Sequence, residues 1–429
     1  MTTSLEKPVA TRLRRGVTPG RLSGRALLAA GVVAFGVLSI VRWTTGENQL
    51  TSSGTMTGAL SLAVPIGLAG LGGLWSERAG VVNIGLEGMM ILGTWAGAWA
   101  GFQWGPWWGV LAGLVGGALG GLLHAVATVT FGVDHIVSGV AITILAGGLA
   151  RYLSVVAFVG EPGGGPTNSP PVRRAMGTVT VPVLSGGQVG GWDSPDLLRT
   201  VERTGVPVVA DLAGVLRGLT HHVSHLTVLA ILLVPLTWFV LWRTAFGLRL
   251  RSCGENPTAA ESLGINVYRM KYVAVVVSGA LAGLAGAFLV TVASSNYQEG
   301  QTAGRGFIGL AAMIFGNWRP TGLAGGAALF GYADKLQLSD AVHPLLVIVA
   351  LVLAALAVRN ILRRRYVAAA AGAVLAVAFA TWFFVTDDVP SQLVSSTPHL
   401  VTLLVLFFAS QRLRMPAADG QPYRRGQSG

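Results

Sequence analysis

Two polar side chains stand in an otherwise apolar stretch and are the first candidates for chemistry. Glu87 lies inside the apolar run 81–101, and Asn83 precedes it by one helical turn on the same face, if the run is helical. A carboxylate in a membrane-length apolar run is costly, so by default it is a candidate for contacting a solute or an ion. The structural alternative is that the Glu87 carboxylate pairs with Arg78 or with a helix end. The sequence leaves both interpretations open.

A second interrupted segment occurs late in the chain. The stretch 80–88 and the stretch 304–311 are both Gly-broken starts of apolar segments, one in each half. Interrupted segments at corresponding places in two halves indicate the solute path of a transporter. We therefore expect the path to be lined by Asn83, Gly85, Glu87, Gly306, Gly309 and Asn317.

Apolar runs of membrane-spanning length recur along the whole chain. Of its 429 residues, 52% are hydrophobic and 11% are charged, whereas about 25% of residues are charged in a soluble domain. The sequence predicts an all-α polytopic membrane protein with about 10–12 transmembrane helices, including Gly-broken or re-entrant segments. The expected spans are 26–43, 55–74, 81–101, 106–128, 135–157, 226–245, 272–293, a Gly-broken pair at 306–318 and 320–337, then 341–358, 366–385 and 395–411.

Arginine-rich segments set the expected orientation of these spans. Counting from a cytoplasmic N-terminus places the basic tail 1–25, the segment 243–271 and the tail 412–429 on one side. Short loops rich in Lys and Arg stay in the cytoplasm, so we expect both termini of this cell-membrane protein to be cytoplasmic, with a transmembrane domain at 26–411. The hydrophilic segment 158–225 then lies outside, either as a docking face for a partner or as a plain interfacial loop. Within it, 197–203 and 208–219 have some helical amphipathicity.

The segment 243–271 is a polar, basic island between two apolar runs, and it carries its own helix signals. Asn256 is a good N-cap, Pro257 suits the first helical position, and Gly264 suits the residue just past the helix end. These signals predict a two-turn helix over 257–263, after which Asn266 caps the next span. Such a helix could press on a partner outside the membrane, although an ordinary connecting loop would carry similar signals.

Several function classes are excluded by residues that are missing. There is no HExxH, no GxSxG and no acidic metal cluster, and the three His residues at 221, 222 and 225 read as an interfacial polar cluster. None of the three lysines follows a glycine as in a Walker A sequence. We expect no cofactor and no metal, and any ATP must be bound by another chain. The net charge of +12 reflects topology rather than nucleic-acid binding.

Four ordered stretches carry a family resemblance. They are WSERAGVVNIGLEGMM at 75–90, GENPTAAESLGIN at 254–266, GRGFIGLAAMIFGNW at 304–318 and MPAADGQPYRRG at 415–426. Together they resemble bacterial ABC-transporter permeases of the simple-sugar and nucleoside uptake branch, within the superfamily of branched-chain amino acid and ribose permeases. The span 26–43 and the region 341–385 look like additions to the shorter members of this branch.

The resemblance implies an uptake system with several chains. A second permease, identical or related, would complete the pathway in the membrane lipid. Cytoplasmic ATP-binding subunits would drive the system, and an extracytoplasmic solute-binding protein would deliver a nucleoside or, as second choice, a simple sugar. The resemblance also implies that the island couples the ATPase to the pathway. The expected coupling residues are Gly254, Glu255, Asn256, Pro257, Ala260, Glu261 and Gly264, with the two glutamates as surface contacts.

Three rival functions remain to be weighed. An ion-coupled secondary transporter would want several acidic or polar groups near mid-membrane, and Glu87 stands almost alone. A membrane-embedded enzyme lacks a nucleophile, a metal site or an acid–base pair. A channel-like or structural membrane subunit would need no neighbouring ATPase.

Overall fold

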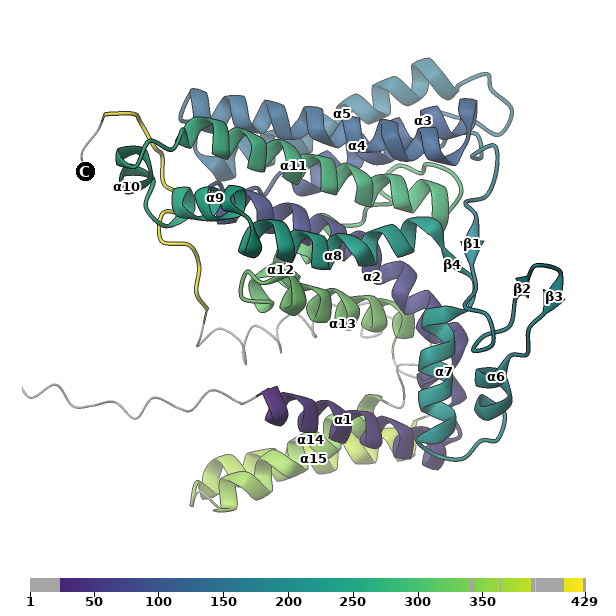
Figure 1. The fold of residues 1–429 in the computed structure, drawn as a ribbon. Coiled ribbons are helices and arrows are strands. Elements are labelled where there is room, and N and C mark those ends of the chain that lie inside the picture. The colour runs from purple at the N-terminus through teal and green to yellow at the C-terminus, as the bar shows by residue number, and fades with distance from the viewer. Residues whose placement is uncertain are drawn as a thin grey trace, which may run out of the picture.

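The computed structural model describes residues 24–339, 343, 345–362, 364–386, 390 and 413–426. Long helices run side by side through the molecule (Figure 1). The first half contains α1 (Gly24–Thr45), the 3₁₀ turn η1 (Asn48–Leu50), α2 (Ser53–Arg78), α3 (Leu86–Trp104), α4 (Pro106–Ala125), the π-helical turn η2 (Val126–Thr130), α5 (His135–Phe158), α6 (Leu197–Glu202) and α7 (Val209–Thr220). The second half contains α8 (His225–Arg243), α9 (Ala245–Glu255), α10 (Pro257–Ser262), α11 (Val267–Phe288), the π-helical turn η3 (Leu289–Ala293), α12 (Arg305–Phe315), α13 (Pro320–Leu338), α14 (Leu345–Leu362) and α15 (Tyr366–Val385).

In the part of the chain that the structure describes, strands are confined to the long hydrophilic segment between α5 and α8. Antiparallel pairs join β1 (Thr178–Val179) to β4 (Val223–Ser224) and β2 (Gln188–Val189) to β3 (Trp192–Asp193). These strands lie with α6 and α7 at one end of the bundle, which we call the α7 end. Helices α9 and α10 and the C-terminal segment 413–426 lie at the opposite end, the α10 end (Figure 1).

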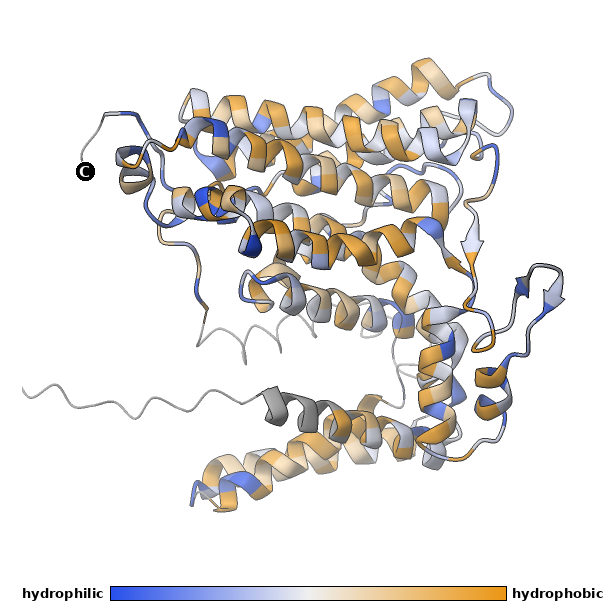
Figure 2. Cartoon of the chain, in the orientation of Figure 1, coloured by the Kyte–Doolittle hydropathy of each residue, from blue (hydrophilic) through white to orange (hydrophobic). Residues whose placement is uncertain are grey.

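The expected all-α, polytopic membrane architecture is confirmed, while the count of about 10–12 spans stays a prediction. Among the described residues, seven helices are long and apolar enough to cross a bilayer: α2, α4 with η2, α5, α8, α11 with η3, α14 and α15. The Gly-broken pair is the 11-residue α12 followed by the 19-residue α13. The expected span 395–411 and nearly all of the tail 1–25 lie outside the described residues. Figure 2 shows apolar residues along most of the length of the long helices, as membrane-spanning helices require.

Glycines let α4 and α11 cross with their backbones in contact. A Cβ built on Gly279 would lie 2.3 Å from the carbonyl oxygen of Gly117, and one on Gly283 would lie 2.2 Å from that of Gly113. Because no side chain fits there, this crossing requires glycine on both helices. It fixes the position of α11, which leads from the α10 end to the interrupted segment before α12.

The two regions that look like additions pack together. Val41 of α1 belongs to one buried cluster with Leu336 of α13 and Leu345 and Ile348 of α14, and α15 runs alongside α14 (Figure 1). Thus the N-terminal helix and the region 341–385 form one group of helices beside the main bundle.

The expected amphipathic segments 197–203 and 208–219 are the helices α6 and α7. Helix α7 lies across the ends of α1 and α2 (Figure 1). Its fully buried Asp211 pairs with Arg42 at 3.0 Å and accepts hydrogen bonds from the hydroxyls of Ser39 and Thr51. A paired and hydrogen-bonded carboxylate tolerates burial, so Asp211 anchors the α7 end to the first helix.

Candidate functional site

The island between α8 and α11 forms the short helix that its caps predict. Asn256 accepts a hydrogen bond from the Ala259 backbone N–H at 3.0 Å, and Pro257 is the first helical residue. Gly264 follows the helix with φ of +80°, a left-handed conformation that suits glycine. Asn266 caps α11 through the Arg269 N–H, also at 3.0 Å. The predicted helix over 257–263 is therefore confirmed as α10.

A second helix, α9, precedes α10 and was not expected from the sequence. Thr244 caps its N-terminus by accepting a hydrogen bond from the Gly247 N–H at 3.1 Å. A Cβ built on Gly254, near its C-terminus, would lie 2.3 Å from the Arg78 carbonyl oxygen at the end of α2. Gly254 is thus a contact residue between α9 and α2.

The C-terminal segment 413–426 lies against α9 and α10. The Ala418 N–H donates to the Gly254 carbonyl at 2.9 Å, and the Ala417 N–H donates to the Glu255 carboxylate at 3.3 Å. These contacts join residues more than 160 positions apart, so no local signal in the sequence indicates them.

Glu261 of α10 is held by the same segment. Its carboxylate accepts a hydrogen bond from the Tyr423 hydroxyl at 2.5 Å and one from Arg425 Nε at 3.1 Å. From the sequence, Glu255 and Glu261 were expected to be surface contacts for the ATP-binding subunits. In the structure each binds the C-terminal segment. The exposed face of α10 is formed instead by Thr258, Ala259, Ser262 and, just past the helix, Leu263, which is 80% exposed.

Buried polar groups connect the end of α2 to the late glycine-rich block. Trp318 Nε1 donates to the Glu77 carboxylate at 2.5 Å, and Arg78 donates to the Trp318 carbonyl at 3.1 and 2.6 Å. Asp419 of the C-terminal segment is buried beside Glu77. Burial raises the pKa of Asp419, and the nearby Glu77 carboxylate raises it further. The four stretches that carry the family resemblance therefore meet at the α10 end.

Glu87 binds the start of α12. Its two carboxylate oxygens accept hydrogen bonds from the backbone N–H groups of Gly304 at 2.9 Å and Gly306 at 2.7 Å. These N–H groups lie at the N-terminus of a helix, where the helix dipole favours a negative charge. The sequence left two structural partners possible for Glu87, which were Arg78 and a helix end. In the structure Glu87 binds the helix end and not Arg78. The side chain is 5% exposed and joins the early interrupted segment to the late one.

Asn83 does not share a helical face with Glu87. Helix α3 begins only at Leu86, and residues 81–83 are not helical, so the expectation of one continuous helix over 81–101 is wrong. Gly80, which has a φ of +82°, and Gly85 flank this interruption. Asn83 is fully buried and donates to the Ser278 hydroxyl at 2.9 Å on α11.

The other expected path residues divide between helix packing and the α10 end. A Cβ on Gly85 would meet Gly139 of α5 at 3.3 Å, and a Cβ on Gly309 would lie 2.8 Å from the Gly70 nitrogen of α2. Asn317 accepts a hydrogen bond from the Arg414 N–H of the C-terminal segment at 2.8 Å. The structure brings Glu87 and Gly306 together but places Asn317 away from them.

Arg151 on α5 has a partner that the sequence did not indicate. It forms an ion pair with Glu299 of the segment 294–304. This partner lies 148 residues away in the sequence, so no local signal indicates the pair. Among the described residues, no three His, Cys, Asp or Glu side chains gather in a way that could hold a metal ion.

Comparison with known proteins places this architecture among permeases. Residues 55–356 match the family described as branched-chain amino acid transport system / permease component. The chain is 31% identical over 375 residues to the guanosine ABC transporter permease protein NupQ of Bacillus subtilis, covering 86% of this chain and 95% of that protein. It is 32% identical to the nucleoside ABC transporter permease protein NupC of Lactococcus lactis, covering 85% and 94%. It is 29% identical to a putative glucose ABC transporter permease protein, TsgC13, of Haloferax volcanii, covering 87% and 98%. No solved structure matches the chain.

Proposed function

Because this chain belongs to the permease family of branched-chain amino acid transport systems and is a permease subunit of an ABC transporter, we propose that it forms the membrane pathway for nucleoside uptake. Two relatives that are more than 30% identical and are matched over more than nine-tenths of their length are named for guanosine and nucleoside transport. A simple sugar is the second candidate, since the TsgC13 relative is named for glucose. A second permease, a solute-binding protein and two ATP-binding subunits would complete the importer.

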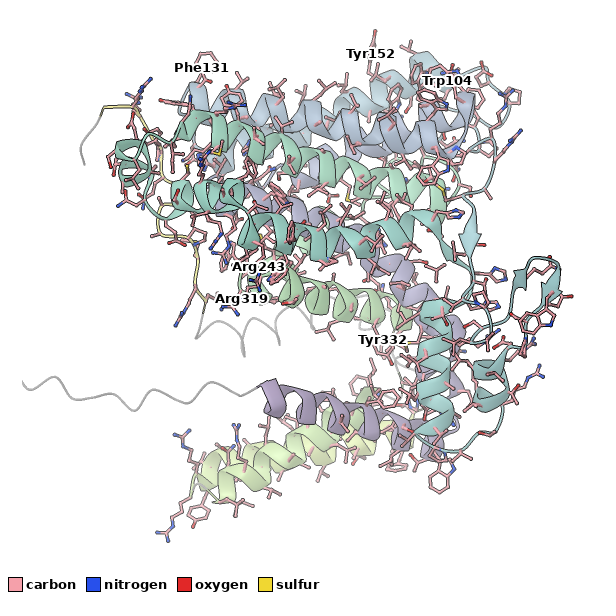
Figure 3. All side chains as sticks on the ribbon, in the orientation of Figure 1. Trp104, Phe131, Tyr152, Arg243, Arg319 and Tyr332 are labelled. Atoms are coloured by element: carbon pink, nitrogen blue, oxygen red, sulfur yellow. The ribbon has the colours of Figure 1, made fainter. Side chains whose placement is uncertain are left out.

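In this proposal the α10 end faces the cytoplasm. Arg243 and Arg319 lie toward this end, whereas Trp104 and Tyr152 lie toward the other (Figure 3). Basic residues in short loops favour the cytoplasmic side, and exposed tryptophans gather at membrane interfaces. Trp104, Trp107 and Trp108, all more than half exposed, supply such a group at the turn between α3 and α4.

The observation that carries the coupling proposal is the exposed capped helix α10. Its Leu263 is an apolar side chain 80% exposed at the tip of the molecule, which suits insertion into a groove on an ATP-binding subunit. Helices α9 and α11 continue from the two ends of α10, and α11 runs on to the interrupted segment before α12. A movement of α10 would therefore be transmitted to the pathway through rigid helices.

Glu255 and Glu261 have a different role in this proposal from the one the sequence suggested. Both hold the C-terminal segment against α9 and α10, so they keep the coupling helix in place, while Leu263 and its neighbours contact the ATPase. ATP binding can switch the pathway only if the ATPase binds the outward and inward states with different affinity.

Substitution of Gly264 tests this coupling. Valine at a φ of +80° costs about 1–2 kcal/mol of backbone strain, whereas asparagine tolerates this conformation. No atom lies within 4 Å of a Cβ added there, so the effect is conformational and not steric. In proteoliposomes containing the complete importer, we expect Gly264→Val to retain ATP hydrolysis but to lower the solute imported per ATP, and Gly264→Asn to resemble wild type. An unchanged ratio in Gly264→Val would refute the coupling role of α10.

A further inference from the structure

A cavity of about 230 Å³ lies between α3, α5 and the segment 294–304. Thr94 of α3 and Gly147 of α5 line it on two sides. The third side is the chain between η3 and α12, which contributes Glu299, Gln301 and Thr302. The cavity is separate from the residues expected from the sequence to line a path, none of which contributes to it.

The segment 294–304 is held in place by backbone pairing with the chain that follows α5. The Val172 N–H donates to the Ser295 carbonyl at 2.7 Å, and the Glu299 N–H donates to the Thr167 carbonyl at 2.8 Å. Between them, the Ser169 N–H donates to the Tyr297 carbonyl at 3.0 Å. Two stretches far apart in the sequence thus form one ordered wall.

The other end of the segment is fixed by Glu87 through the N–H groups of Gly304 and Gly306. A segment held at both ends presents its side chains at fixed positions. Such preorganisation lowers the entropy lost when a ligand binds, so the wall of the cavity has the rigidity that a binding site needs.

One buried hydrogen-bond donor in this wall has no acceptor in the structure. The Gln301 side-chain oxygen accepts the Gln298 N–H at 2.7 Å, which fixes the orientation of the amide. Its Nε2 is buried and has no partner in the structure. An unsatisfied buried donor costs free energy, and a ligand in the cavity could supply the missing acceptor.

A matched charge pair stands at the same cavity. The Glu299 carboxylate lines the cavity and pairs with Arg151, and these side chains remain 42% and 49% exposed. Arg151 lies on the membrane-spanning helix α5, where contact with lipid would be costly. Both charges are therefore expected to face water. Because they cancel, the site suits a neutral solute rather than an ion.

We propose that this cavity binds the neighbouring hydroxyl groups of a sugar ring, either in a nucleoside or in a free sugar. A carboxylate accepts hydrogen bonds from two hydroxyls, and a side-chain amide donates to a hydroxyl oxygen. Glu299 and Gln301 supply these groups side by side, with the hydroxyl of Thr302 close to them in the chain. The proposal rests on the proposed function and assigns the contact with the solute to the segment 294–304.

Two adjacent glycines of α5 provide a matched test. A Cβ added at either Gly147 or Gly148 meets no atom within 4 Å, but only Gly147 lines the cavity. In the complete importer we expect Gly147→Leu to lower ATP-driven uptake of a radiolabelled nucleoside at least about tenfold, while Gly148→Leu transports like wild type. Both variants should retain the thermal stability and ATP hydrolysis of the wild type. Wild-type uptake by Gly147→Leu would overturn the proposal.

A second measurement identifies the chemical group that is bound. Uptake of a nucleoside is compared with uptake of its 2′,3′-dideoxy analogue, in wild type and in Glu299→Gln, with the same solute-binding protein throughout. We expect wild type to favour the nucleoside and Glu299→Gln to lose about tenfold of that preference, because a hydrogen bond to a charged group is lost. An unchanged preference would overturn the proposal.

Competition by free ribose and by a free nucleobase distinguishes the two sources of the hydroxyl groups. If free ribose inhibits uptake, the site binds a free sugar. If only the intact nucleoside inhibits uptake, the site binds a nucleoside. If the nucleobase inhibits uptake as strongly as the nucleoside does, the assignment of sugar hydroxyls is overturned. If the wild-type importer shows no ATP-driven uptake of nucleoside or sugar, the proposed function itself fails, and the site fails with it. Normal uptake by wild type and by Gly147→Leu refutes the site alone.

Discussion

Replacing Glu87 with glutamine tests how the early interrupted segment is joined to α12. The carboxylate now accepts hydrogen bonds from two backbone N–H groups, at 2.9 and 2.7 Å. Hydrogen bonds to a charged group contribute about 1.5–3 kcal/mol each. Glutamine keeps one acceptor oxygen but turns an NH₂ group toward the second N–H. We therefore expect the substitution to cost about 2–4 kcal/mol of stability, from one lost bond, one unsatisfied donor and the lost charge at the helix N-terminus.

Thermal unfolding of the complex in lipid nanodiscs measures this cost. A loss of this size should lower the midpoint by roughly 2–4 °C for a chain of this length. Glu161→Gln is the matched control, because Glu161 is exposed in the loop after α5, and its midpoint should not change. If Glu87→Gln unfolds at the wild-type temperature and yet abolishes uptake, then Glu87 acts on the solute and not as a helix cap, and the reasoning is refuted.

Two further predictions concern the helix crossing and the C-terminal segment. Gly283→Leu should prevent assembly of the folded permease, seen as loss of a monodisperse peak in size-exclusion chromatography, because its Cβ would lie 2.2 Å from the Gly113 carbonyl oxygen; normal folding would contradict the close crossing. Burial and the Glu77 carboxylate raise the pKa of Asp419, and Lys271 partly offsets this rise. Docking of the C-terminal segment 413–426 should therefore be strongest below about pH 4 and should weaken as the pH rises through the raised pKa of Asp419. The measurement is hydrogen-exchange protection of the backbone amides of 413–426, corrected for intrinsic exchange rates. This protection should fall with rising pH in wild type but not in Asp419→Asn. If protection changes with pH in the same way in both proteins, the role of Asp419 is contradicted.

The sequence predicts best those features that depend on neighbouring residues. Helix α10 follows from an N-cap, a proline and a glycine within nine positions, so its bounds could be predicted from 256–264 alone. The spans follow from apolar runs, and the amphipathic patterns at 197–203 and 208–219 identify α6 and α7. Each of these signals lies within one or two turns of the element it describes.

The site itself depends on contacts between distant residues, which no local signal contains. Glu87 meets Gly304 across 217 positions, Arg151 meets Glu299 across 148, and Glu261 meets Tyr423 across 162. One local error, a shared face for Asn83 and Glu87, came from treating a Gly-rich stretch as continuous helix. Glycine disfavours the helix interior, and here the chain becomes helical only at residue 86.

The most direct test of the account is uptake into proteoliposomes containing the permease, its partner permease, the ATP-binding subunits and the solute-binding protein. Radiolabelled nucleoside uptake is measured with ATP on the side of the ATP-binding subunits, before and after ionophores collapse the proton and sodium gradients. The account predicts that uptake requires ATP and continues unchanged without the gradients. Uptake that stops when the gradients collapse, or that proceeds without ATP, would show an ion-coupled transporter and contradict the account.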